Sequence, residues 1–115
     1  MDVQIDGEGV HEIRDALGLV PLHEAEDRPV TGGYAGDLLS WVMGNAQSGD
    51  CWITIMSNRN VPAVCTLTDV AMVIFAEDVT PDDAAVEAAE RNDLNFYRSP
   101  LSVFDLCAKV AALLS

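Results

Sequence analysis

Four polar residues of the chain have the chemistry of an anion-binding site. Arg59 and Arg98 supply guanidinium groups, which bind phosphate and carboxylate oxygens through several N–H donors. Asn58 and Ser99 stand next to them in the sequence and add neutral hydrogen-bonding groups. Each pair follows a segment with the composition of a strand, so we expect all four at one edge of a parallel sheet. The alternative is that the arginines pair with acids such as those at residues 77–78, and the acidity of the chain favours that pairing.

A glycine-rich string at residues 31–37, with the sequence TGGYAGD, has two interpretations. Glycines let a backbone approach a phosphate closely, but they serve tight turns and helix packing equally well. The string lacks the GxGxxG pattern of dinucleotide-binding loops. Asp37 would repel an anion and is more simply explained as the cap of a following helix. The structural interpretation is therefore favoured over a phosphate-binding loop.

No combination of residues predicts a catalytic centre or a metal site. His11 and His23 have no cysteine or histidine companions at the spacing of metal ligands, and we interpret them as surface residues. Ser40 and Ser57 lack the GxSxG context of an activated nucleophile. Lys109 is the only lysine, which excludes a phosphate-binding loop of the GxxxxGK type. We therefore predict no catalytic residue, no metal and no cofactor.

Length and charge narrow the class of protein further. The 115 residues suffice for one domain, and 50% of them are hydrophobic, which supports a core without disulfides or metal. A net charge of -13 disfavours nucleic acid and anionic membrane surfaces as partners. No stretch of the sequence is long and apolar enough to span a membrane, and residues 1–5 lack the features that begin a signal peptide.

The cysteines indicate a compartment. Cys51, Cys65 and Cys107 are odd in number and have no CxxC spacing, so we expect three reduced and mostly buried thiols. Reduced thiols are typical of the cytoplasm, and we expect a cytoplasmic protein.

Short apolar runs alternate with helical patterns along the chain. Strands are predicted at residues 51–56, 71–75 and 95–98, and a brief one at 19–22. Helices are predicted at residues 10–17, at 37–46 and after a cap at Asn60, and the second of these has almost no polar face, which predicts cover on nearly all sides. Two further helices have start signals, one with Thr80 as the cap and Pro81 as the first helical residue, and one with Ser99 as the cap before Pro100. This βαβαβα order predicts an α/β fold, a three-layer α/β/α sandwich with a mainly parallel central sheet and a short amino-terminal helix and strand.

The last predicted helix carries more apolar surface than one sheet can cover. Its apolar residues fall on two sides, one with Phe104, Ala108 and Ala111 and the other with Leu106, Val110 and Leu113. Two explanations stay open: the helix forms a homodimer interface, or the acidic amino-terminal segment covers it. We divide the chain into that segment, residues 1–26, and an α/β region at residues 27–115, which make one domain overall.

Residues 27–41, with the sequence DRPVTGGYAGDLLSW, closely resemble the signature of the DRTGG domain family. Residues 52–54 resemble its WIT strand, residues 60–64 its NVVAV stretch and residues 99–106 its closing helix. The resemblance is ordered and covers most of the chain from about Glu8 onward. The residues that carry the family motif are Asp27, Arg28, Thr31, Gly32, Gly33 and Asp37.

The resemblance implies an accessory or regulatory α/β module. Members of that family occur as the amino-terminal domain of HPr kinase/phosphorylase, within some phosphotransacetylases, beside CBS pairs, and as small proteins encoded near iron-only hydrogenases. Kinase activity is not implied, because the catalytic domain of the kinase is a separate region with a phosphate-binding loop. Many relatives have a histidine where this chain has Asn58, which further weakens a catalytic interpretation.

We therefore expect a non-enzymatic regulatory or protein-interaction module of DRTGG type. One alternative is a sensor domain that binds a small anion or a nucleotide at the carboxyl edge of the sheet, through Asn58, Arg59, Arg98 and Ser99. Another alternative, which rests on the resemblance alone, is an accessory protein associated with iron-only hydrogenase. The expected partners are a second copy of the chain, another protein or a small anionic ligand.

Overall fold

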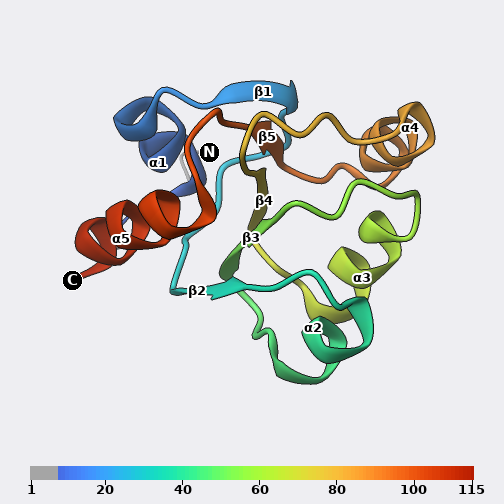
Figure 1. The fold of residues 1–115 in the computed structure, drawn as a ribbon, viewed down its shortest axis with the longest axis horizontal. Coiled ribbons are helices and arrows are strands. Elements are labelled where there is room, and N and C mark those ends of the chain that lie inside the picture. The colour runs from blue at the N-terminus through green and yellow to red at the C-terminus, as the bar shows by residue number, and fades with distance from the viewer. Residues whose placement is uncertain (1–7) are drawn as a thin grey trace.

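A five-stranded sheet forms the centre of the computed structural model, which describes residues 8–115 (Figure 1). The strand order is β1-β5-β4-β3-β2, and β1 alone runs antiparallel to its neighbour. The strands are β1 (Val20–His23), β2 (Gly32–Ala35), β3 (Asp50–Thr54), β4 (Met72–Phe75) and β5 (Phe96–Arg98). The predicted, mainly parallel sheet is confirmed.

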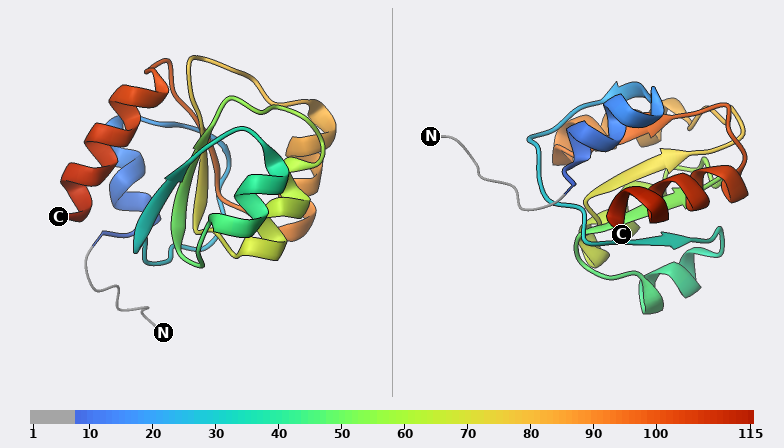
Figure 2. Two further views of the ribbon diagram at one scale, coloured as in Figure 1. Left: turned by 60° about the horizontal axis from the view of Figure 1, so that its bottom comes forward. Right: turned by 90° about the vertical axis from the view of Figure 1, so that its left-hand side faces the viewer.

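Helices cover both faces of this sheet, which gives the predicted three layers (Figure 2). Helices α1 (Val10–Leu17) and α5 (Val103–Leu114) lie on one face. Helices α2 (Leu39–Asn45), α3 (Val61–Thr68) and α4 (Asp83–Asn92) lie on the other. The alternation of strand and helix in the sequence produces this arrangement because parallel strands need crossover connections.

The two central strands are buried along their whole length, as their apolar composition predicts. Cys51 and Ile53 of β3 face the layer of α1 and α5, whereas Trp52 between them faces the other layer. The indole N–H of Trp52 donates to the Gly36 carbonyl at 2.9 Å, so the buried ring leaves no polar group unpaired.

The amino-terminal segment belongs to the same core from residue 8 onward. Val10 and Ile13 of α1 are fully buried against α5, and the Val30 N–H donates to the Glu8 carbonyl at 2.9 Å. Strand β1 then extends the sheet beside β5. Residues 1–7, which include the start examined for a signal peptide and the first part of the predicted segment 1–26, lie outside the described residues.

One of the two predicted explanations, cover by the amino-terminal segment, applies to part of the apolar surface of the last helix. Helix α1 covers one side of α5, where Leu106 and Val110 are buried. On the other side Phe104 is 81% exposed, and Ala108 and Ala111 are exposed with it. The amino-terminal segment therefore accounts for one apolar side of this helix and leaves the second open.

Two helices begin later than their sequence signals predict. Helix α4 begins at Asp83 rather than Pro81, because the Asp82 N–H donates to the Ser57 carbonyl and holds that stretch extended. Helix α5 is capped by Ser102, whose hydroxyl accepts the Asp105 N–H at 3.1 Å. Ser99, the predicted cap, instead follows the last residue of β5, and its hydroxyl accepts from the Leu101 N–H.

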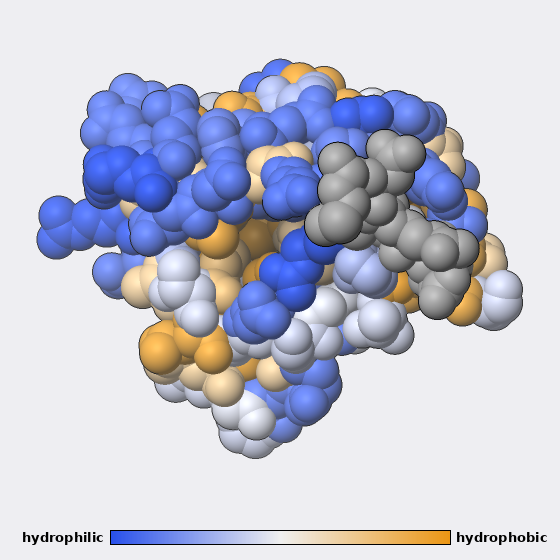
Figure 3. Space-filling model, turned by 180° about the vertical axis from the view of Figure 1, so that it is seen from behind, coloured by the Kyte–Doolittle hydropathy of each residue, from blue (hydrophilic) through white to orange (hydrophobic). Residues whose placement is uncertain are grey.

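Helix α2 is not covered on nearly all sides, and that prediction is wrong. It packs mainly on α3, at one end of the molecule, and only Val42 is buried. Leu38 and Trp41 are 66% and 64% exposed. Seen from behind, hydrophobic residues gather at the end of the molecule that carries α2 and α3, whereas the α4 end is hydrophilic (Figure 3).

Candidate functional site

The carboxyl edge of the sheet holds the four predicted ligand-binding residues. Asn58 and Arg59 lie in the loop after β3, and Arg98 and Ser99 lie at the end of β5. Strand β4 stands between β3 and β5, so the two pairs follow strands whose axes lie roughly 10 Å apart. The fold brings all four to one edge, as predicted, but does not bring the pairs into contact.

The segment at residues 77–82 separates the two pairs. Its Thr80 hydroxyl accepts from the Arg98 guanidinium at 3.2 Å, and its Asp82 N–H donates to the Ser57 carbonyl at 2.8 Å. The Asp78 carboxylate lies 3.6 Å from the Arg98 Nε atom. Arg98 thus has the acidic partner that the sequence offered as the alternative to an anion.

The backbone of this segment is held in an unusual conformation. Glu77 and Asp78 both have positive φ, 56° and 61°, which costs about 1–2 kcal/mol for each non-glycine residue. The Glu77 N–H donates to the Leu101 carbonyl and the Asp78 N–H to the Ser99 carbonyl, at 2.8 and 2.9 Å. These bonds fix the segment against the β5–α5 connection and stabilise the strained residues.

The side chains of Asn58 and Arg59 differ in the hydrogen bonds and ion pairs that they make within the protein. The Asn58 side chain accepts the Asn60 N–H at 2.9 Å, which shapes the turn that begins α3. Its amide nitrogen lies 3.3 Å from the Met56 sulfur. Arg59 is exposed and takes part in no ion pair within residues 8–115. Of the four predicted residues, Arg59 is the one with a guanidinium open to a ligand, while Ser99 is buried.

The first two residues of the family motif lie away from this edge. The Arg28 guanidinium donates to the Asp69 carboxylate at 3.0 Å and to the Asp69 carbonyl at 3.3 Å. Asp69 caps the end of α3 with φ 59°, and it also accepts from the Ser48 hydroxyl. The guanidinium, and secondarily that hydroxyl, lower the pKa of Asp69. The neighbouring Asp27 carboxylate accepts the backbone N–H of His11 at 3.1 Å. Asp27 and Arg28 therefore both hold the fold together.

The motif glycines form an edge strand rather than a loop. Gly32 and Gly33 belong to β2, where a Cβ atom on Gly32 would lie 2.7 Å from an Asp50 carboxylate oxygen. On the facing turn, a Cβ on Gly49 would lie 2.5 Å from the Thr31 hydroxyl. These close approaches explain the glycines through packing, which is the interpretation the sequence favoured.

Asp37, the last motif residue, is not the predicted helix cap. Its carboxylate accepts from the Thr54 hydroxyl at 2.8 Å and from the Ile55 N–H at 2.9 Å. The residue that begins α2 is Leu38, which has no side-chain acceptor. Asp37 therefore ties the β2–α2 connection to the end of β3 instead of satisfying the helix start.

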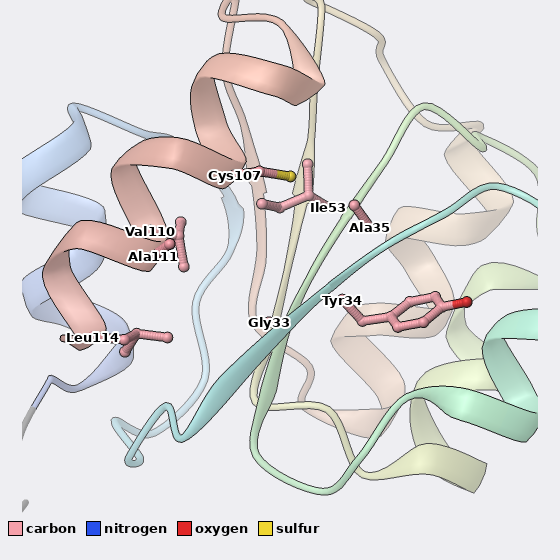
Figure 4. Close-up of a pocket in the computed structure, with 8 residues that line it drawn as sticks. All are labelled: Gly33, Tyr34, Ala35, Ile53, Cys107, Val110, Ala111 and Leu114. Atoms are coloured by element: carbon pink, nitrogen blue, oxygen red, sulfur yellow. The ribbon is translucent and has the colours of Figure 1, made fainter.

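An apolar groove, which the sequence did not single out, lies between β2 and α5 (Figure 4). Its volume is about 260 Å³. The Tyr34 side chain points to the opposite face of the sheet, so β2 lines the groove mostly with backbone and small side chains. The lining residues are Gly33, Tyr34, Ala35, Ile53, Cys107, Val110, Ala111 and Leu114. The sequence signal for it was the surplus of apolar residues on the last helix.

A polar cluster joins α1 to the β1 side of the sheet and was also missed. The Glu24 carboxylate accepts from the Arg14 guanidinium and, at 3.2 Å, from the Tyr97 hydroxyl. Burial, and secondarily the Glu24 charge, raise the pKa of Tyr97. His11 lies 3.5 Å from Glu24, and His23 bonds the Leu94 carbonyl at 2.9 Å. The histidines are half-buried structural residues rather than plain surface residues.

A second, more polar pocket of about 250 Å³ lies at the amino edge of β4 and β5. Asn95 closes it by accepting the Ala25 N–H at 2.8 Å and donating to the Glu26 carbonyl at 3.3 Å. Both polar ends of the Asn95 amide are therefore bonded to the protein rather than open to a ligand.

Within residues 8–115, no group of three or more His, Cys, Asp or Glu side chains is placed to hold a metal ion. All three cysteines are free thiols, with Cys51 and Cys65 buried and Cys107 half-buried, which confirms the prediction. Burial raises the pKa of Cys65 to about 12. In the same part of the chain, no helix has the length and hydrophobicity to cross a membrane.

The fold is similar to that of a structure of the CBS and DRTGG domains of the regulatory region of Clostridium perfringens pyrophosphatase, in complex with the activator diadenosine tetraphosphate. The TM-score is 0.67 at 15% sequence identity, over 91% of this chain and 45% of the other. This chain therefore spans less than half the length of that structure. No family model matches the sequence, and no curated protein matches it. The similarity shows a DRTGG-like α/β fold.

Proposed function

We propose that this chain is a regulatory module of DRTGG type that acts by binding rather than by catalysis. The observation that carries the proposal is the similarity of fold, over 91% of the chain, to a regulatory region that binds a nucleotide activator. The sequence motif at residues 27–41 supports the same class. The contacts of the described residues agree with it, because the polar side chains of the motif bond to the protein and no activated nucleophile stands among them.

Calorimetry tests the regulatory proposal directly. Diadenosine tetraphosphate, ATP, AMP and inorganic phosphate are titrated separately into the purified chain, and each mixture is then analysed for products. The proposal expects heat of binding from a nucleotide and an unchanged nucleotide afterwards. Repeated turnover of any of the four compounds by the pure protein contradicts a non-enzymatic module.

A second candidate names the place where a nucleotide or small anion would bind, the carboxyl edge with Asn58, Arg59, Arg98 and Ser99. Its support is the exposed guanidinium of Arg59 beside the start of α3, where the positive end of the helix dipole favours an anion. A ligand with more than one phosphate could reach across the segment at residues 77–82 to Arg98. Binding there would exchange the Asp78 carboxylate for a phosphate oxygen as the acidic partner of Arg98.

Thermal unfolding with matched variants tests this location. A ligand at 100 times its dissociation constant stabilises a protein by about 2.7 kcal/mol, which raises the melting temperature of a chain of this size by roughly 10 °C. Arg59→Ala should abolish the increase. Arg91→Ala, an exposed arginine at the far end of α4, should leave it unchanged. Equal loss in both variants would indicate a general charge effect and would reject the site.

An association with iron-only hydrogenase remains a prediction from the family resemblance. Co-purification of the tagged chain with hydrogenase subunits, against a tagged chain of similar net charge as control, tests it separately from nucleotide binding.

A further inference from the structure

The exposed side of α5 carries one large apolar side chain followed by small ones. Phe104 is 81% exposed, more than any other large hydrophobic residue described. Ala108 and Ala111 follow it at spacings of four and seven residues, so all three lie along one face of the helix. Small side chains at such spacing let another helix approach closely.

The apolar groove lies on the same helix, further along. Its α5 residues are Cys107, Val110, Ala111 and Leu114, so its centre is about 10 Å from Phe104 along the axis, at 1.5 Å per residue. Phe104 does not line this groove in its own chain. A volume of about 260 Å³ with apolar walls is suited to an aromatic ring.

A two-fold axis matches these two features to each other. If the axis crosses α5 midway between Cys107 and Ala108, two copies of the helix pack antiparallel. Residues equally distant from that midpoint then meet across the interface, so Phe104 of one copy lies opposite Ala111 of the other. Ala111 lines the groove. The Phe104 side chain of each copy therefore lies at the groove of the other, and the two-fold axis produces this contact twice in a symmetric dimer.

Charge also favours a second copy at this face. The chain carries a net charge of -13, which opposes self-association over most of its surface. Within α5 itself, however, the charged residues are one acid, Asp105, and one base, Lys109, so the helix side chains carry no net charge. In the antiparallel arrangement Asp105 of one copy comes close to Lys109 of the other, and both are exposed beside the apolar stripe.

We propose that the chain forms a homodimer through α5, with Phe104 of each copy inserted in the groove between β2 and α5 of the other. The proposal does not depend on the regulatory function or on nucleotide binding. It goes beyond the homodimer that the sequence suggested, because it assigns the two-fold axis, the inserted residue and the pocket that receives it.

Sedimentation velocity on the full chain, from 1 to about 100 µM, measures the association. The unmodified chain should sediment at twice its mass of 12.4 kDa at the upper concentrations. Phe104→Asp should sediment as a monomer throughout, since it places a charge in the apolar groove. Trp41→Asp is the matched control, an exposed aromatic residue on the opposite layer, and should remain a dimer. Because both side chains are exposed, circular dichroism should show both variants folded.

Exchange of the two charges tests the antiparallel register. Asp105→Lys alone and Lys109→Asp alone should each weaken the dimer, because each places like charges opposite one another. The double variant Asp105→Lys, Lys109→Asp should restore the association of the unmodified chain. A monomeric unmodified chain at 100 µM, a dimer that survives Phe104→Asp, or a double variant as weak as the single ones would overturn the proposal.

Discussion

The Asp37 carboxylate accepts the Thr54 hydroxyl proton at 2.8 Å and the Ile55 N–H at 2.9 Å. Thr54 is fully buried, at the end of β3. One side chain from the β2–α2 connection thus satisfies two donors where a central strand stops. These two hydrogen bonds explain Asp37, the one acidic residue of the glycine-rich string, without a bound ligand.

Removal of this carboxylate should destabilise the fold without changing it. Asp37→Ala leaves both donors without their acceptor, and we expect a loss of about 1–3 kcal/mol in the free energy of unfolding. Urea denaturation followed by tryptophan fluorescence measures the change. Glu87→Ala, which removes an exposed carboxylate of α4, should alter it by less than about 0.5 kcal/mol. An Asp37→Ala variant as stable as Glu87→Ala would mean that water replaces the carboxylate at no cost.

The glycines should separate into sensitive and tolerant positions. Gly49→Ala combines a φ of +85° with a Cβ only 2.5 Å from the Thr31 hydroxyl, and Gly32→Ala brings a Cβ to 2.7 Å from the Asp50 carboxylate. We expect each to cost about 1–3 kcal/mol. Gly44→Ala meets no atom within 4 Å and should be neutral or stabilising by up to about 1 kcal/mol. Thermal unfolding of the three variants gives the order, and a destabilised Gly44→Ala would contradict it.

The two central strands and the layers could be predicted because burial dominates them, whereas the glycine-rich and only partly buried β2 was not predicted as a strand. β3 and β4 are short, apolar on both faces and flanked by turn residues, a pattern that a helix or an exposed strand does not produce. The same argument failed for α2, where Leu38 and Trp41 are apolar but exposed. An apolar side chain indicates only that burial would be favourable. It does not show whether the helix packs on the sheet or, like α2, packs mainly on another helix at one end of the molecule.

Helix starts and the candidate site depended on tertiary contacts that local patterns do not contain. Pro81 had the signal of a first helical residue, but a hydrogen bond from the next residue to Ser57 delays the start. The carboxyl edge was located correctly from the order of strands and helices. The segment at residues 77–82 separates Arg59 from Arg98 because it is bonded to Ser57 on one side and to Arg98 on the other. No spacing in the sequence reveals these hydrogen bonds.

The Arg28–Asp69 pair should contribute to stability above a defined pH. The guanidinium lowers the pKa of Asp69 below its ordinary 3.8, so the folded state binds this proton less readily than the unfolded chain. The contribution is therefore complete above pH 3.8 and is lost as the pH falls through the lower folded value. Because the Asp69 side chain is 62% exposed, solvent screening limits it to about 1 kcal/mol or less.

Asp69→Asn isolates this effect, since asparagine tolerates the positive φ of the position. The unmodified chain should be the more stable of the two at pH 6, and the difference should be smaller at pH 2.5, below the ordinary pKa of 3.8. Urea denaturation at both pH values, at low and high salt, measures it. A difference that grows on acidification would have the wrong sign for a carboxylate whose pKa is lowered.

The three thiols should react in the order of their burial. Burial raises the pKa of all three, but Cys51 and Cys65 are enclosed in the core whereas Cys107 borders the open groove. Since the thiolate is the reactive form, iodoacetamide should label Cys107 first in the dilute, monomeric chain, in which the groove is open, and the other two only as the protein unfolds. Mass spectrometry of labelled peptides identifies the site, and Cys107→Ala should remove the early reaction. If Cys51 were labelled as fast as Cys107 in the folded chain, helix α5 would have to move away from β3, because Cys51 is fully buried while the two are packed together.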